Sequence, residues 1–390
     1  MRISLPILIL LLTLNLAGQT KPDSALIFPV QEKHVHSSSI VELPNGDFLV
    51  CWFKGSGERW ANDVIIEGAR LRKGESKWSE PFLMADSPGQ PDCNPVLFLN
   101  NKGKLFLVWI VVQADQWENS ILKVKTTTDY EKGEAPDWQW QDVILLKPGD
   151  EFVRCVEDQF RKNAREDITY AGYAPPYEEL LTEAAKDPKK RETGWMTRTH
   201  PIILQNGKIL LPLYSDGFNF GLIAISEDQG KTWKPGLPIV GRGLNQPSLV
   251  VRKDGTIDAY MRQDGDEPSS IMISHSNDEG YSWTFARKSN LPNPGASIEV
   301  IRLKNGDWLL AYNDVEDGRY SLAVAVSDDE GATWKWKRNL EYQKGSSFSY
   351  PSVIQAKDGK IHLTYSYHLG KDQESIKYVT FDENWIKSTK

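Results

Sequence analysis

The chain has 390 residues, of which 40% are hydrophobic and 25% charged, and its 14 Trp and 14 Tyr allow a large buried core. The formal net charge is -7, and no run of Lys or Arg rises above the background. These features argue against a disordered tail and against a nucleic-acid or anionic-membrane partner. A ligand that is uncharged, or that is recognised at one local site, fits this composition better than a nucleic acid or an anionic membrane.

The N-terminus has the pattern of a secretory signal. Residues 1–2 carry a positive charge, residues 5–16 form an apolar run, and small residues follow at 17–18. We expect cleavage near Gly18, which leaves 19–390 as a mature chain in the periplasm or outside the cell. The apolar run is too short to span a bilayer, so we expect no membrane span.

The metal-binding residue types show no motif. The three cysteines, Cys51, Cys93 and Cys155, are isolated, and the six histidines lack ligand spacing. We therefore predict neither a disulfide framework nor a metal or cofactor, although calcium on a loop stays open.

The strongest signal is an internal repeat of an apolar strand, a turn that ends in Gly, and a second apolar strand. The six copies are SSIVELPNGDFLVCW from Ser38, NPVLFLNNKGKLFLVW from Asn94, HPIILQNGKILLPLY from His200, QPSLVVRKDGTIDAYM from Gln246, SIEVIRLKNGDWLLAY from Ser297 and YPSVIQAKDGKIHLTY from Tyr350. The turn glycines are Gly46, Gly103, Gly207, Gly255, Gly306 and Gly359. The interval from Gly103 to Gly207 is about twice the others, and 147–199 within it has helical composition. We expect a helical insertion there, over the rim.

A second motif, S-x-D-x-G-x-[ST]-W, follows three of these hairpins. It reads SEDQGKTW from Ser226, SNDEGYSW from Ser276 and SDDEGATW from Ser327. Its Asp and Ser cap a tight turn, its Gly takes the left-handed conformation, and its Trp packs under the hairpin. The hairpin repeats six times, and the three turns of this kind are in phase with it. Together they predict an all-β, six-bladed β-propeller of four-stranded antiparallel blades, and not a sandwich or a solenoid.

The innermost strand of a propeller blade starts near the axis, so the residue just before the first apolar position of each repeat should look into a central funnel. These residues are Ser37, Asn94, His200, Gln246, Ser297 and Tyr350, and all are polar. Either a ligand pocket or a water-filled channel explains this pattern.

Further polar residues surround this ring in the chain. They are His36, Glu58, Arg59 and Asp63 in unit 1, Asp92 in unit 2, Arg262 in unit 4 and Arg319 in unit 5. Two arginines at one funnel imply a carboxylate-bearing ligand, because the guanidinium fork matches a carboxylate. Each arginine could instead bridge two blades.

These motifs resemble the sialidase (neuraminidase) superfamily over nearly the whole mature chain, although the Asp-box turns specify the fold and not the activity. The resemblance implies that Tyr350 is the nucleophile and Asp63 the acid/base, with Arg59 near it. It also implies that Arg262 and Arg319 are the second and third arginines of the carboxylate site.

Two positions depart from the sialidase pattern. His36 stands where the first arginine is expected, and Gln246 replaces the Glu partner of the tyrosine. A Gln side chain cannot take the phenol proton, so the usual activation lacks its base.

Three interpretations follow, and all describe a monomer that takes a carbohydrate. The first is a hydrolase of a terminal acidic sugar, with Tyr350, Asp63, His36 and Gln246 as catalytic residues. The substrate-binding residues would be Arg262, Arg319, Arg59, Asn94, His200 and Asp92. The second is a polysaccharide lyase that uses a His or Tyr base next to a uronic acid. The third is a propeller lectin without turnover.

Overall fold

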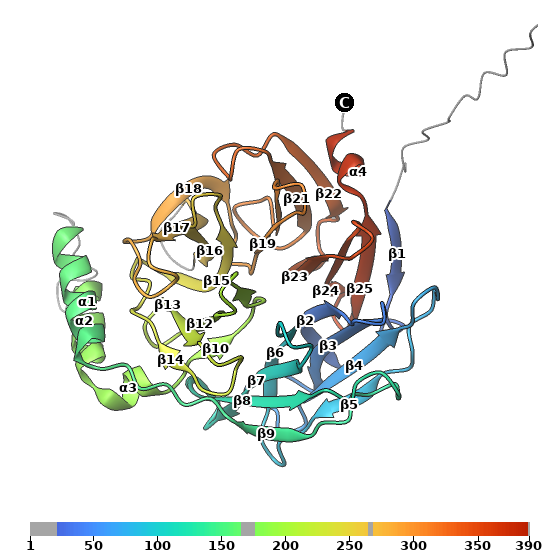
Figure 1. Ribbon diagram of the computed structural model, residues 1–390, viewed down its shortest axis with the longest axis horizontal. Helices are drawn as coiled ribbons and strands as arrows, with labels where there is room; N and C mark the ends of the chain where they lie inside the picture. The colour runs from blue at the N-terminus through green and yellow to red at the C-terminus, as the bar shows by residue number, and fades with distance from the viewer. Residues whose placement is uncertain (1–21, 165–175, 264–267, 389–390) are drawn as a thin grey trace, which may run out of the picture.

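Six antiparallel sheets stand around a central axis in a computed structural model of the chain, as Figure 1 shows. The structure describes residues 22–164, 176–263 and 268–388. The predicted signal sequence therefore lies outside the described residues, as does 165–175 of the predicted insertion. The prediction of a six-bladed propeller is confirmed.

Blades 1 to 3 follow each other in chain order. Their strands are β2 (His34–Glu42), β3 (Phe48–Gly55), β4 (Ile65–Leu71), β5 (Phe82–Ala85), β6 (Asp92–Leu99), β7 (Leu105–Gln113), β8 (Gln116–Thr127), β9 (Trp140–Val143), β10 (Met196–Thr197), β11 (Ile202–Ile203), β12 (Ile209–Ser215), β13 (Phe220–Ser226) and β14 (Lys234–Pro235). Blade 3 has a divided inner strand, because β10 and β11 both pair with β12.

Blades 4 to 6 complete the ring. Their strands are β15 (Leu244–Val251), β16 (Ile257–Gln263), β17 (Ser270–Ser276), β18 (Arg287–Pro292), β19 (Glu299–Arg302), β20 (Trp308–Tyr312), β21 (Ser321–Ser327), β22 (Trp336–Tyr342), β23 (Ser347–Gln355), β24 (Ile361–Gly370) and β25 (Gln373–Phe381). The N-terminal strand β1 (Asp23–Leu26) pairs with β25 and supplies the outer strand of blade 6. The two ends of the described chain therefore close the ring together.

The predicted helical insertion forms α1 (Asp150–Lys162), α2 (Tyr177–Lys186) and α3 (Pro188–Glu192). Phe152 and Phe160 of α1 are buried and pack against Phe218 and Phe220 of blade 3. Figure 1 shows the helices on the outer side of the ring, away from the axis. A short helix, α4 (Glu383–Lys387), ends the described chain. No helix within the described ranges is long and apolar enough to cross a membrane.

The three Asp-box turns have the predicted geometry and join neighbouring blades. In the box of blade 5, the hydroxyl of Ser327 accepts a hydrogen bond from the Gly331 backbone N–H and donates one to Asp329. Gly331 has a φ of +81° and packs against Tyr260 of the preceding blade. Gly230 and Gly280 pack in the same way against Phe106 and Leu210. The motif thus places a glycine, which has no side chain, against the previous blade.

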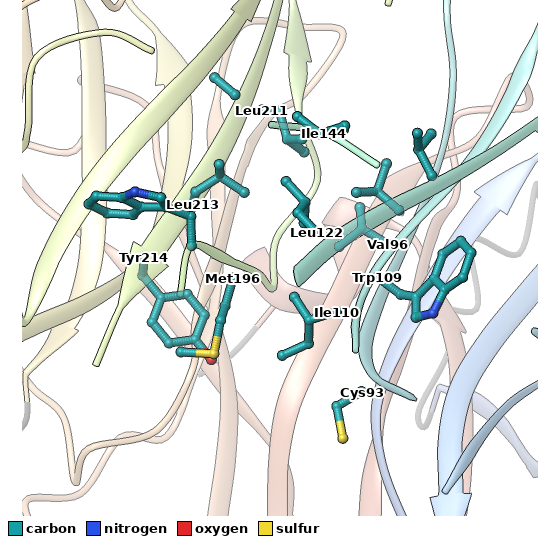
Figure 2. Packing of buried hydrophobic residues seen from close by; sticks show 14 of the residues in the cluster. Cys93, Val96, Trp109, Ile110, Leu122, Ile144, Met196, Leu211, Leu213 and Tyr214 are labelled. Atoms are coloured by element: carbon teal, nitrogen blue, oxygen red, sulfur yellow. The ribbon is translucent and has the colours of Figure 1, made fainter. Parts of the chain in front are cut away.

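The core lies between the faces of adjacent blades. Figure 2 shows this packing between blades 2 and 3, where Val96, Ile110 and Leu122 face Met196 and Leu213. These apolar layers fix the blades relative to one another. The polar residues at the axis are held on the inner strands of this rigid frame.

Candidate functional site

A β-bulge at the same place in four inner strands turns side chains toward the axis. The pairing register shifts between His36 and Ser39, and equivalent shifts occur in β6, β15 and β23. At each bulge one residue has a left-handed backbone, and these residues are Ser37, Asn94, Gln246 and Tyr350, with φ between 49° and 59°. Four blades therefore hold a strained non-glycine residue, an arrangement found at functional sites.

The ring around the axis consists of one residue per blade, at the position of these bulges. Each bulge residue lies nine positions before the turn glycine of its hairpin, and the same count gives Ser297 in blade 5 and Arg198 in blade 3. Arg198 reaches the axis, where its guanidinium donates hydrogen bonds to the carbonyls of Pro351 and Ser38. His200, the residue predicted for this ring, lies two positions further along the chain. Sequence reasoning missed Arg198, although counting back from Gly207 would have found it.

Tyr350 is the centre of the site. Its hydroxyl accepts a hydrogen bond of 3.0 Å from Arg262 Nη1 and one of 3.2 Å from Gln246 Nε2. Two further cations lie close to the ring, since the guanidinium carbons of Arg198 and Arg319 are 4.8 Å and 5.4 Å from its centroid. Tyr350 is 8% exposed, so part of its side chain reaches solvent.

Arg262 and Arg319 are held side by side by one carbonyl. The Gly295 oxygen accepts hydrogen bonds from Arg262 Nη1 at 3.2 Å and from Arg319 Nη2 at 3.0 Å. The two arginines come from blades 4 and 5, as the sequence predicts.

His36 packs directly on Tyr350. The two ring centroids are 4.1 Å apart, and His36 is buried. Burial, together with the charges of His34 and His368, holds the pKa of His36 well below its ordinary value, so the imidazole is neutral. Its Nδ1 is buried without a hydrogen-bond partner among the described residues.

Asn94 and Tyr214 form the blade 2 and blade 3 side of the site. Asn94 Nδ2 donates a hydrogen bond of 3.1 Å to the Tyr214 hydroxyl. Burial and the charge of Asp216 raise the pKa of Tyr214 well above its ordinary value. Tyr214 was not predicted, because it follows the apolar run of a second strand and has no motif of its own.

His200 and Glu299 form a buried ion pair. Glu299 Oε1 is 2.8 Å from His200 Nδ1, and Glu299 Oε2 accepts a hydrogen bond from the Val353 backbone N–H. Burial opposes both charges, yet the pair raises the pKa of His200 and lowers that of Glu299. His200 Nε2 contacts the carbonyl oxygen of Ile40. His200 is thus held between Glu299 and the inner strand of blade 1.

Asp63 and Arg59 lie outside these contacts, on the loop between β3 and β4. Asp63 accepts hydrogen bonds from the backbone N–H and hydroxyl of Ser56 and from Lys33 Nζ. These bonds, those of Ser56 first, hold the pKa of Asp63 well below its usual range. Arg59 donates to the carbonyl of Asp115 and stacks over Trp60 and Trp117.

Asp92 has a structural contact in blade 2. Its carboxylate accepts hydrogen bonds of 2.6 Å from Trp109 Nε1 and from the Ser87 backbone N–H. Burial raises the pKa of this carboxyl. The structure therefore joins Tyr350, Gln246, His36, Arg262 and Arg319 at one centre and leaves Asp92, Asp63 and Arg59 in contacts of their own.

The fold and this axial centre define a six-bladed propeller of the sialidase-like kind. A family model described as BNR repeat-like domain matches residues 46–156 and 187–363, and the chain belongs to this family. The matched range includes Gln246, Arg262, Arg319 and Tyr350.

Two curated relatives match parts of the chain. A sialidase of Bacteroides fragilis is 22% identical over 223 residues, which are 53% of this chain and 38% of that protein. A sialidase of Paraclostridium sordellii is 27% identical over 128 residues, which are 28% of this chain and 31% of that protein. The matches thus span less than half the length of these relatives.

Solved structures share the fold at low identity. A protein of unknown function from Dyadobacter fermentans has a TM-score of 0.67 at 17% identity, with 92% of this chain and 98% of that chain covered. The intramolecular trans-sialidase of Ruminococcus gnavus has a TM-score of 0.67 at 12% identity, with 92% and 96% covered. The NanB sialidase of Streptococcus pneumoniae has a TM-score of 0.68 at 12% identity, with 93% and 71% covered.

Proposed function

We propose that this protein hydrolyses the glycosidic bond of a terminal, carboxylate-bearing sugar, and that it does so outside the cytoplasm after removal of the predicted signal sequence. The observation that carries the proposal is the convergence of Arg262, Arg319 and Tyr350 on one partly open centre. Support for sialidase-like chemistry comes from the family and from the two curated sialidases.

The arginine pair would hold the carboxylate of the sugar. Arg262 and Arg319 share the Gly295 carbonyl, which fixes both guanidinium groups on one side of Tyr350. A guanidinium binds a carboxylate through two parallel N–H bonds, so a pair of them favours an acidic sugar over a neutral one. The Ruminococcus gnavus relative in fold was solved with oseltamivir carboxylate, a ligand that carries this group.

Tyr350 would act at the anomeric carbon, as a nucleophile or as a stabiliser of the positive charge that develops there. Its oxygen accepts hydrogen bonds from Arg262 and Gln246, so negative charge on that oxygen is stabilised without a carboxylate base. Arg198, 4.8 Å from the ring centroid, adds a buried positive charge near it. The arginines would thus offset the missing Glu.

Asp63 would protonate the leaving oxygen and later activate water. In the described arrangement its carboxylate is ionised and bonded to Lys33 and Ser56. A general acid must carry a proton, so we propose that an entering glycan displaces Lys33 from Asp63. Lys33 is half exposed, which leaves it free to move.

A second candidate is elimination next to a uronic acid, and the position of His36 favours it. The imidazole packs at 4.1 Å on the Tyr350 ring and has a buried Nδ1 without a partner among the described residues. A base of this kind could take the C5 proton while Arg262 and Arg319 neutralise the uronate. This mechanism needs no Glu beside Tyr350.

One screen separates these functions. The mature protein is incubated with a panel of sialosides and uronate-containing oligosaccharides, and the products are identified by mass and by ultraviolet absorbance. Hydrolysis adds one water to the products, whereas elimination adds none and creates an absorbing unsaturated uronate. Release of a free acidic sugar by the wild type, but not by Tyr350→Phe, is the expected result. Binding without turnover would instead indicate a lectin and contradict the proposal.

A further inference from the structure

Two histidines and a glutamate meet where blade 6 closes against blade 1. His34 begins β2, His368 is near the end of β24, and Glu374 is near the start of β25. Suitable donor atoms of the three side chains all lie within 4.8 Å of one another. The cluster adjoins the axial site, because the His34 and His368 rings are 5.6 Å and 5.7 Å from the ring of His36.

The distances within the cluster fit ligands of one ion. Glu374 Oε2 is 2.8 Å from His34 Nδ1 and 3.3 Å from His368 Nε2. Two ligands, each about 2.0–2.2 Å from a tetrahedral zinc ion, are roughly 3.3–3.5 Å apart. The distance to His368 matches, and the distance to His34 has to open by about 0.5–0.7 Å. Two imidazoles and one carboxylate are also a donor set that suits zinc and related transition metals.

The surroundings supply the partners that a metal-bound histidine requires. A histidine that binds a metal through one nitrogen usually gives the other N–H to a carboxylate. Glu58 Oε1 lies 3.1 Å from His34 Nε2, on the side away from Glu374. The Val35 backbone N–H donates a hydrogen bond of 3.0 Å to Glu374 Oε2 and orients that carboxylate.

The cluster is also accessible. The exposed fractions of the His34, His368 and Glu374 side chains are 23%, 15% and 17%, which leaves an entry path from solvent. Without a metal, Glu374 contacts both histidines, and His368 Nε2 donates a hydrogen bond to the Val35 carbonyl oxygen. An incoming ion has to replace these protons.

We propose that His34, His368 and Glu374 bind one divalent transition-metal ion, with Zn²⁺ as the best chemical match and water in the remaining position. The ion would join blade 1 to blade 6 where the chain closes its ring. This site is independent of the proposed hydrolysis, because none of its three ligands is assigned a catalytic role. The histidines show no ligand spacing in the sequence, because the three ligands come from opposite ends of the chain.

The test is zinc binding by the mature, metal-stripped protein in slightly alkaline buffer, measured by calorimetry and by metal analysis after dialysis. We expect one Zn²⁺ per chain and a higher melting temperature with zinc than with EDTA. His368→Ala and Glu374→Gln should abolish stoichiometric binding and the zinc-dependent shift. Glu58→Gln should weaken binding by about 10–100-fold, as expected for a group that orients a ligand.

A matched control is His275→Ala, which removes a half-exposed histidine of blade 4 that pairs with Asp258. It should retain one Zn²⁺ per chain. The melting temperatures of all variants in EDTA show whether each is folded, so that a loss of binding can be assigned to the site. Absence of zinc binding by the wild type would overturn the proposal, and so would unchanged binding by the folded His368→Ala and Glu374→Gln variants.

Discussion

The side-chain amide of Gln246 lies 3.2 Å from the hydroxyl of Tyr350 and donates a hydrogen bond to it. Both residues occupy the left-handed position of a β-bulge, in blades 4 and 6. The sequence predicts that these two residues meet, and the structure brings them together. Because a second donor, Arg262, points at the same oxygen, the hydroxyl is an acceptor in this centre.

Tyr350→Phe tests the role of that oxygen. We expect turnover of the best substrate to fall by about 10²–10⁴-fold, because the variant removes the reacting group and keeps the ring close to Arg198 and Arg319. The dissociation constant of the acidic sugar should change far less. Steady-state kinetics and calorimetry measure the two effects, with the exposed Tyr281→Phe as control. Equal kcat values for wild type and Tyr350→Phe would exclude Tyr350 from the reaction.

Lys33 contributes to keeping Asp63, the proposed general acid, ionised. Lys33→Met removes one of the bonds that lower the pKa of Asp63, after those from Ser56. The pKa of Asp63 should therefore rise, and its protonated form should persist to higher pH. We expect the alkaline limb of the pH–kcat/KM profile to move upward. An unchanged limb, together with full activity of Asp63→Asn, would remove Asp63 from the mechanism.

The buried pair of His200 and Glu299 should make stability depend on pH. The folded pKa of His200 is raised, so its contribution is complete below the ordinary value of 6.5 and is lost as pH rises through the folded pKa. The folded pKa of Glu299 is lowered, so its contribution is complete above 4.5 and is lost as pH falls through the folded pKa. Both contributions are therefore complete between pH 4.5 and pH 6.5.

Glu299→Gln removes this pair while the permanent charge of nearby Arg198 stays. The difference in unfolding free energy between wild type and variant should be largest between pH 4.5 and pH 6.5 and should narrow on both sides. Urea titrations at a series of pH values measure it. A difference that does not vary with pH would mean that the two groups are not charged in the folded protein.

The Asp-box glycine of blade 5 should tolerate no side chain. A Cβ at Gly331 would lie 2.2 Å from the Tyr260 hydroxyl and 3.0 Å from the Trp308 ring. Gly255 has a similar positive φ, but a Cβ there would meet no atom within 4 Å. Both Ala variants lose about 1–2 kcal/mol through the left-handed backbone. We expect Gly331→Ala to lose about 1–3 kcal/mol more through overpacking, as measured by denaturant unfolding. Equal losses would show that the turn yields to the extra atom.

The sequence predicts the parts of the site that follow the repeat. In each repeat, a polar residue precedes a strand of period 2, and a turn Gly follows it. This pattern predicted that Tyr350, Gln246 and Asn94 lie at the same height on the inner strands. Blade 3 was placed less well, because its inner strand is divided and its repeat was aligned at His200 instead of Arg198.

Contacts outside the repeat could not be predicted in the same way. Asp63 and Arg59 lie on a loop whose path depends on partners such as Lys33 and Asp115, which no local pattern specifies. The meeting of Glu374 with His34 depends on how the ring closes. Only the assembled propeller reveals it.

The central claim is that Arg262 and Arg319 select a carboxylate. Calorimetry with a free sugar acid and with its methyl ester tests it most directly, using N-acetylneuraminic and glucuronic acids. The wild type should bind one of these acids about 10–100-fold more tightly than its ester, as hydrogen bonds between charged groups contribute about 1.5–3 kcal/mol. Arg319→Met should lose most of this preference, whereas Arg59→Met, whose arginine stacks on Trp60 and Trp117, should keep it. Equal affinity of the wild type for acid and ester would contradict the account.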